Sequence, residues 1–326
     1  MAETHLSAEH SGTRALRGVA GHLVARAAGR LSAAALSDTA VHAARKDLKK
    51  SRAAVRLLRD ALGERAYRRE NARLRDAAHA LNAARDAKVL VQTLESLRRT
   101  HAGLREDPGV RRLARRLQTE QATLQRQLRQ RPVPLRQACV ALRRVRRRSR
   151  HWQVGRHGWS VLGPAFRRIY RSGRRAVPTA RPRPADPALH EWRKRVKYLR
   201  YALQMLTPMQ PQRLPALARQ AESLTDSLGE AHDLALLAQQ ATRLARTERW
   251  DLQHLLRVID QHHRRLTVDA LVTGERLYRA RPRDLNRQLG RYWRRWRRRP
   301  RQAQPLSRSR RPRAVPDLPD VRARGA

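Results

Sequence analysis

The sequence predicts an all-α fold, and three observations support that prediction. Leu and Ala recur at three- and four-residue spacing along nearly the whole chain, which is the period of an amphipathic helix. Alternating runs of β-branched or aromatic residues, which are typical of strands, do not occur. Prolines interrupt the helical pattern and divide the chain into roughly eight to ten predicted helices. The short connections between these helices favour antiparallel packing into bundles.

Proline also marks where the parts of the chain are expected to begin and end. The segment PTARPRPADP, residues 178–187, is the clearest internal boundary. Residues 1–12 are predicted to be a flexible N-terminus. Residues 299–326 are rich in Arg, Pro and Ser and are predicted to be a disordered basic tail. A helical domain is therefore expected over residues 13–298.

Two segments of this domain repeat each other. VHAARKDLKKSRAAVRLLRDAL, residues 41–62, aligns without a gap onto LHEWRKRVKYLRYALQML, residues 189–206. A second shared signature follows each copy, LNAARDAKVL in the first half and LGEAHDLALL in the second. We therefore predict an internal duplication, folded as two pseudo-symmetric antiparallel helical bundles. The repeat halves are about residues 13–150 and 151–298.

Charge is the dominant feature of the composition. The chain carries 74 Lys and Arg against 27 Asp and Glu, a formal net charge of +47. This excess goes beyond what solubility requires, so we expect an anionic partner. Every lysine except Lys88 falls inside the two repeated segments. The lysines are therefore clustered in the two repeated segments, and the general abundance of Arg does not explain this clustering.

In each repeated segment the basic residues fall on one face of the predicted helix, given about 100° of rotation per residue. The two basic stripes comprise His42, Arg45, Lys46, Lys49 and Arg52, and His190, Arg193, Lys194, Lys197 and Arg200. Leu and Val gather on a separate face that is expected to pack. Like charges within a stripe repel one another, and no acidic residue is expected to relieve them. A phosphate chain would do so, because each Arg or Lys contact is a charge-assisted hydrogen bond.

The two stripe histidines have two interpretations, which the sequence leaves open. Beside a phosphate, the charged form of His42 or His190 is favoured, so that each ring supplies a further donor. Alternatively, each ring is partly buried and fixes the packing of its helix. Aspartates of the second signature, Asp86 and Asp233, are predicted to orient neighbouring arginines rather than to contact an anion.

The repeated segments resemble the conserved histidine α-helical domain family, abbreviated CHAD. The resemblance rests on VHAARKDLKKSR, on LHEWRKRVKYLRY, on the two later signatures, and on GPAFRRIYRSGRRA ahead of the second copy. The RPRDLNRQLGRYW segment is similar to the family's closing helix. Family members are helical duplications around a basic groove or pore and are associated with inorganic polyphosphate and its granules. The resemblance implies that both stripes line such a groove, with Arg85, Tyr170 and Arg174 as further candidates.

The predicted function is therefore the binding of inorganic polyphosphate at the two stripes, in the cytoplasm and at polyphosphate granules. We expect no enzymatic activity, no cofactor and no metal. Some family members carry a tunnel-forming triphosphate-processing domain ahead of the helical one. Nothing before residue 13 resembles that domain, so its chemistry is not carried over to this chain.

Nonspecific binding of RNA or DNA is the main alternative, because counterion release from phosphates does not depend on what the phosphates are attached to. Aromatic residues, on which single-stranded bases stack, make up only 4% of the chain. A metal-dependent enzyme is less favoured, because His262 and His263 lack convincing ligand spacing and no HExxH motif is present. Docking to a membrane is not expected, because no helix shows an exposed apolar wedge.

Overall fold

A computed structural model describes residues 6, 12–33, 36–130, 133–155, 157–177 and 187–298, the side chains of residues 82–84 excepted. Over these residues the chain forms thirteen α-helices, one short 3-10 helix and no strand, which confirms the predicted all-α class. In chain order they are α1 (Gly12–Ser32), α2 (Asp38–Leu57), α3 (Arg59–Leu62), α4 (Glu64–His79), α5 (Asn82–Thr100), α6 (Ala102–Glu106), α7 (Pro108–Arg129), α8 (Val133–Ser149), α9 (Trp159–Arg175), α10 (Pro187–Leu206), η1 (Thr207–Met209), α11 (Leu214–Thr247), α12 (Gln253–Leu277) and α13 (Pro282–Arg298).

The prediction of roughly eight to ten helices was too low, because several helix ends contain no proline. Gly63, with φ of 77°, separates α3 from α4, and Arg249, with φ of 53°, lies between α11 and α12. Pro164 lies inside α9 without ending it. Pro108 and Pro282 are the first residues of α7 and α13, where a missing backbone N–H costs nothing.

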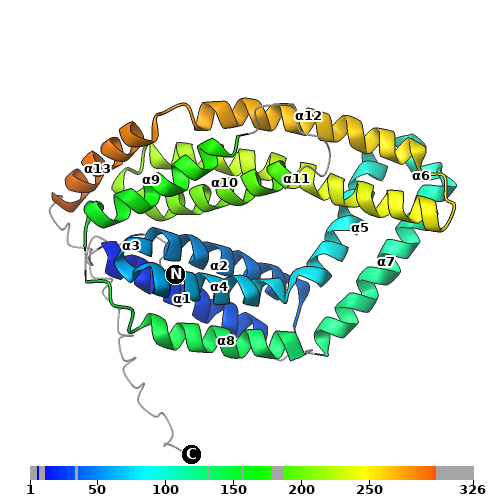
Figure 1. Ribbon diagram of the computed structural model, residues 1–326. Coiled ribbons are helices and arrows are strands. Elements are labelled where there is room, and N and C mark those ends of the chain that lie inside the picture. The colour runs from blue at the N-terminus through cyan, green and yellow to red at the C-terminus, as the bar shows by residue number, and fades with distance from the viewer. Residues whose placement is uncertain are drawn as a thin grey trace, which may run out of the picture.

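The helices form two layers, which α5, α6 and α7 bridge at one end (Figure 1). The first layer is a four-helix bundle in which α1 contacts α2 and α8, and α4 contacts the same two helices. The second layer contains α9 to α13. Helices α5, α6 and α7 run from the first layer to the far ends of α11 and α12. The layers meet where α2 contacts α10, so the two repeated segments lie against each other.

The contacts of the two halves follow a common order. α2 packs on α1 and α4, and α10 packs on α9 and α11. Likewise α8 contacts α1 while α13 contacts α9, and α5 contacts α7 while α11 contacts α12. This order is what a duplicated chain would give, although the duplication itself stays a prediction.

The apolar faces predicted for α2 and α10 are buried. Leu48 and Val55 of α2 and Trp192 of α10 are each 0% exposed. Ser37 caps α2, because its Oγ accepts a hydrogen bond from the N–H of Ala40 at 3.1 Å. Packing thus fixes both helices independently of the basic side chains that they carry, and capping also fixes the start of α2.

Trp192 fits against Gly274 of α12 without room for a larger residue. A Cβ atom at position 274 would lie 2.4 Å from Cζ2 of the indole. Gly274→Ala is therefore expected to cost about 1–3 kcal/mol through overpacking and to lower Tm by several degrees. Gly29→Ala is the control, since a Cβ there meets nothing within 4 Å. Thermal unfolding of both variants checks this, and equal Tm values would contradict it.

Parts of the predicted domain division lie outside the described residues, namely 1–5, 7–11, 178–186 and the tail 299–326. Leu6 is an exception within the predicted flexible N-terminus. Its side chain is 3% exposed, and its backbone N–H donates to the carbonyl oxygen of Met205 at 3.0 Å. Within the described part of the chain, no helix has the length and apolar content that crossing a bilayer requires.

Candidate functional site

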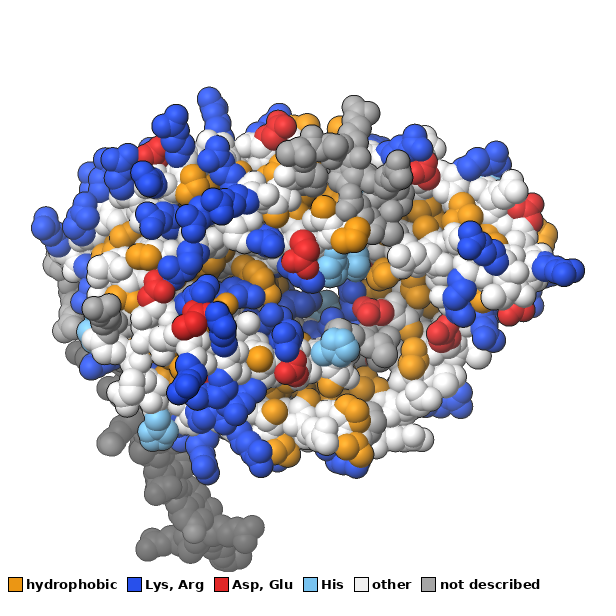
Figure 2. Space-filling model, viewed as in Figure 1, with side chains coloured by type: hydrophobic (Ala, Val, Ile, Leu, Met, Phe, Trp, Pro, Cys, Tyr) orange, Lys and Arg blue, Asp and Glu red, His pale blue; other side chains and the backbone are white. Residues whose placement is uncertain are grey.

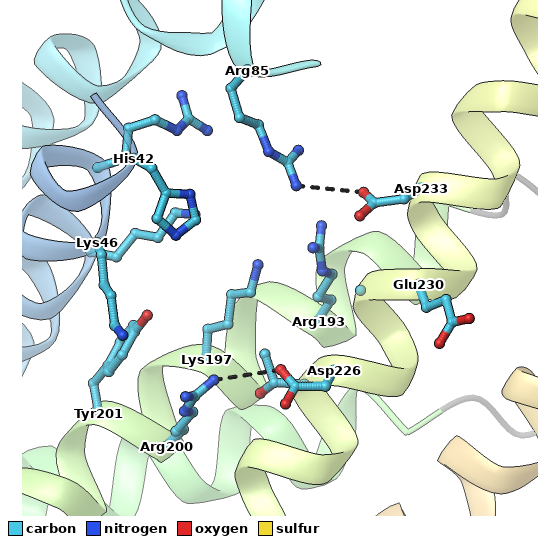
Figure 3. A pocket seen from close by; sticks show the side chains of 14 residues that line it. His42, Lys46, Arg85, Arg193, Lys197, Arg200, Tyr201, Asp226, Glu230 and Asp233 are labelled. Atoms are coloured by element: carbon cyan, nitrogen blue, oxygen red, sulfur yellow. Dashed lines mark ion pairs between the residues drawn. The ribbon is translucent and has the colours of Figure 1, made fainter. Parts of the chain in front are cut away.

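A pocket of about 350 Å³ lies where α2, α10 and α11 face one another, with Arg85 of α5 at its edge (Figure 3). Figure 2 shows Lys and Arg side chains inside a hollow near the middle of this face, with acidic and His side chains around it. We call the cavity the basic pocket. It is lined by His42, Arg45, Lys46, Lys49, Arg85, Arg193, Lys197, Arg200, Tyr201, Thr225, Asp226, Gly229, Glu230 and Asp233.

The basic pocket brings together most of the two predicted stripes. Its cationic and histidine lining consists of residues predicted from sequence: His42, Arg45, Lys46 and Lys49 from α2, Arg85 from α5, and Arg193, Lys197 and Arg200 from α10. The stripes therefore face a single cavity.

Three stripe residues, Arg52, Lys194 and His190, lie outside the basic pocket. The Nε of Arg52 donates to Oδ1 of Asn71 at 3.2 Å, and its guanidinium lies 5.7 Å from the ring centre of Tyr198. Lys194 is exposed, and its Nζ lies 2.6 Å from Oε1 of Glu191. Each predicted stripe is wider than the helix face that lines the pocket. Residues at the edges of a stripe therefore contact other side chains instead.

Two candidates that came only from the family resemblance also lie away from the basic pocket. Tyr170 is 2% exposed, and its hydroxyl donates to the carbonyl oxygens of Leu277 at 3.2 Å and Ala280 at 3.1 Å. Burial raises the pKa of this phenol to about 12. Tyr170 thus joins α9 to the end of α12 within the core. Arg174 is an exposed residue of α9 and does not line the pocket.

The stripe histidines differ in their surroundings. The ring of His190 lies against that of His232, with 4.7 Å between centroids, and both rings line a neighbouring, separate pocket. Burial lowers the pKa of His190, and burial together with the Arg193 charge lowers that of His232 to about 3. His190 is therefore neutral at pH 7 and packs on α11. His42 is exposed at the basic pocket, and burial and Lys49 lower its pKa.

The cations inside the basic pocket are crowded and partly desolvated. Burial and the charge of Arg85 lower the pKa of Arg45, which is 9% exposed, to about 10. Burial, Arg45 and Arg85 lower the pKa of Lys49 to about 7. Burial, Arg193 and Lys49 lower the pKa of Lys197 to about 6. Both lysines therefore lose much of their charge near neutral pH in the free protein, and an anion between them would restore it.

The expectation that no acidic residue relieves the stripes was wrong for Lys194, which pairs with Glu191 on its own helix, and for Arg200. Its guanidinium forms an ion pair with Glu222, and its Nη1 lies 3.6 Å from Oδ1 of Asp226. Both carboxylates belong to α11, which packs on α10. A helical wheel of α10 alone does not show them, although their spacing of four residues places them on one face of α11.

Arg85 is held by the two aspartates that sequence reasoning assigned to that role. Its Nη1 lies 3.0 Å from Oδ1 of Asp86, and its Nη2 lies 3.5 Å from Oδ1 of Asp233. The second pair crosses from α5 to α11 (Figure 3). These contacts fix Arg85 at the edge of the pocket, beside the largely buried amines of Lys49 and Lys197.

Fold and site together define an all-helical protein with a cationic pocket between two helical layers. A family model described as the CHAD domain matches residues 14–242, and the chain belongs to this family. The match extends from α1 into α11 and includes every residue that lines the basic pocket. α12 and α13, with the segment similar to the family's closing helix, lie beyond the matched range. A comparison with curated proteins found no match.

Proposed function

We propose that the basic pocket binds inorganic polyphosphate and that the chain is a binding protein rather than an enzyme. Membership of the CHAD-domain family supports a polyphosphate-related role. The observation that carries the proposal is the pair Lys49 and Lys197, which come from the two repeated helices and line one cavity. Their lowered pKa values indicate that burial and neighbouring cations disfavour the charged form of both lysines in the free protein. A bound polyanion would offset this unfavourable free energy.

The arginines of the pocket support the same ligand. A guanidinium presents a planar fork of donors that matches the oxygens of a phosphate. Within the described part of the chain, the buried Nε of Arg193 has no hydrogen-bond partner. This nitrogen is closed to solvent, so a phosphate beside Lys197 would instead accept from the terminal nitrogens of the Arg193 guanidinium. Each such charge-assisted bond contributes about 1.5–3 kcal/mol.

Nucleic-acid binding remains the second candidate, and the basic pocket favours it less. A single strand binds through a charged groove together with exposed aromatic rings on which bases stack. Tyr201 is the aromatic residue in the pocket lining and is only 6% exposed. A bare phosphate chain carries no bases and needs no such ring. We propose that this pocket binds polyphosphate in the cytoplasm, at polyphosphate granules.

Thermal unfolding with and without long-chain polyphosphate tests the proposal. A ligand at about 100 times its Kd stabilises the folded state by about 2.7 kcal/mol, which raises Tm by about 4 °C in a chain of this size. Lys197→Met keeps the length of the side chain and removes its charge, so the rise in Tm should be much smaller. An equal rise in the wild type and in K197M would contradict the proposal.

Gly229 keeps the α11 wall of the pocket clear for Arg193. A Cβ atom at position 229 would lie 3.2 Å from Nη2 of Arg193, so the guanidinium would have to move. Gly229→Ala should therefore weaken polyphosphate binding about three- to tenfold, roughly 0.7–1.4 kcal/mol. Helix propensity favours Ala by about 0.5–1 kcal/mol, so Tm should not fall. A binding titration and a thermal melt check both parts, and unchanged affinity would argue against this role of Gly229.

A further inference from the structure

A second cavity, of about 380 Å³, lies between α1 and α8 on the first layer. We call it the outer groove; it is lined by Arg17, Gly18, Gly21, His22, Ala25, Arg146, Ser149 and Arg150. Its walls carry three arginines and one histidine, and its lining contains no carboxylate. The basic pocket, by contrast, contains three acidic residues in its lining. The outer groove is therefore a cationic cavity in which no lining side chain neutralises the positive charge.

The nearest buried carboxylates of this bundle are committed to other arginines. Asp47 of α2 forms ion pairs with Arg26 and Arg30 of α1. Glu70 of α4 is 0% exposed and accepts from Nε and Nη2 of Arg148 at 3.0 and 3.1 Å. These carboxylates fix α1 and α8 from inside the bundle. They leave the arginines of the outer groove facing solvent.

The side chains of the outer groove remain available to a ligand. Arg146 of α8 and Arg150, the residue that follows this helix, are both exposed and lie four positions apart in the sequence. Arg17 donates from Nη1 to the carbonyl oxygen of Trp152 at 3.3 Å and keeps its other donors. A Cβ at Gly18 would meet nothing within 4 Å, so an anion can approach the backbone of α1 there. Burial and Arg26 lower the pKa of His22, so its neutral ring offers a donor without adding charge.

The outer groove and the basic pocket lie on different sides of the first layer. α1 contacts α2 and α8, while α4 contacts α2 and α8, so the four helices enclose one core. α2 faces α10 at the basic pocket, and the α1–α8 edge lies along the other side of the bundle (Figure 1). A short chain bound in one site cannot fill the other.

We propose that the outer groove is a second phosphate-binding site, which takes a separate segment of polyphosphate and lets one protein molecule bridge two chains. The inference rests on the proposed function of the basic pocket. Exposed cations at the outer groove give weaker binding than the buried cations of the basic pocket, because their contacts are more screened by water and salt. Two sites of unequal affinity follow, and long chains joined through them would form a network.

Calorimetric titration with a short polyphosphate chain of defined length tests the second site. The wild type should bind two chains, one tightly and one more weakly. Arg146→Ala with Arg150→Ala should lower the weaker affinity about tenfold or more, and leave the tight site unchanged. Arg112→Ala with Arg116→Ala is the matched control, because it removes the same charge from exposed positions on α7 outside this groove. It should bind like the wild type.

A second variant keeps the test independent of the arginine pair. Gly18→Glu places a carboxylate in open space on the α1 wall of the outer groove and should abolish the weaker site. With long-chain polyphosphate, light scattering should rise for the wild type and the control, and stay low for both groove variants. If the groove variants match the control in stoichiometry and scattering, the outer groove is not a site, and the tight site still stands. If the wild type binds no short chain at all, the proposed function fails as well.

Discussion

Replacing Arg193 and Lys197 together with Ala is expected to weaken the binding of long-chain polyphosphate about 100-fold or more. Two charge-assisted hydrogen bonds of about 1.5–3 kcal/mol each are lost, and every 1.4 kcal/mol is a factor of ten in Kd. Both side chains line the basic pocket, and neither belongs to the buried apolar face of α10. Helicity by circular dichroism should therefore remain that of the wild type. A fluorescence titration measures the affinity.

The matched control for this variant lies on the same helix. Lys194 is one turn from Lys197 in the sequence, but its Nζ pairs with Glu191 and it does not line the pocket. Lys194→Ala should change the affinity less than threefold, whereas Lys197→Ala alone should change it at least tenfold, about 1.4 kcal/mol. Equal effects of the two single substitutions would mean that net charge, not the pocket, determines binding. Loss of helicity in the double variant would place Arg193 and Lys197 in the framework of the fold.

The affinity for polyphosphate is expected to fall as pH rises from about 6 to 9. In the free protein the pKa of Lys49 is about 7 and that of Lys197 about 6, and a bound polyanion favours the charged form of both. Binding therefore takes up protons wherever a lysine is neutral in the free protein and charged in the complex. Each such lysine weakens binding by up to about tenfold per pH unit. Calorimetry in buffers of different ionisation enthalpy should show uptake of about one to two protons near pH 7.5.

Lys197→Arg is the control for this pH dependence, because guanidinium stays charged over the whole range. The variant should retain polyphosphate binding and lose about one of the protons taken up. Affinity that is constant between pH 6 and 9 in the wild type would contradict the assignment of Lys49 and Lys197 to the ligand.

The same two lysines affect the stability of the free protein with the opposite dependence on pH. Their folded-state pKa values lie below the unfolded value of about 10.4, so between about pH 6 and 10 the unfolded chain binds more protons than the folded chain. The free energy of unfolding should therefore rise with pH over this window. Affinity falls while stability rises, which distinguishes these lysines from groups that serve the fold alone.

The sequence allowed much of the helical framework and the two cationic helices to be predicted. Periodicity identified α2 and α10 because their apolar and basic residues occupy separate faces, and Leu48 and Trp192 are buried as this pattern requires. The number of helices was underestimated because glycine and the left-handed conformation of Arg249 end helices as proline does. A glycine at a helix end can be recognised in the sequence, whereas a left-handed Arg has no such signal.

The site itself could be predicted only in part. Each helical wheel identified most of the cations that line the basic pocket, but a wheel does not show which part of the basic face meets another helix. Lys194 was therefore grouped with Lys197, although it points to Glu191. Glu222 was missed because it belongs to a helix that becomes a neighbour of Arg200 only in the folded chain. Tyr170 came from resemblance alone, and its buried hydroxyl serves the core.

The central claim is that the basic pocket recognises a bare phosphate chain and not charge in general. The most direct test is a competition titration at about 0.15 M salt, where charge between exposed groups is screened beyond about 8 Å. Long-chain polyphosphate and single-stranded RNA of matched phosphate number each displace one labelled ligand. We predict that polyphosphate binds at least tenfold more tightly, a difference of about 1.4 kcal/mol. Equal or tighter binding of RNA would contradict the claim and make nucleic acid the preferred partner.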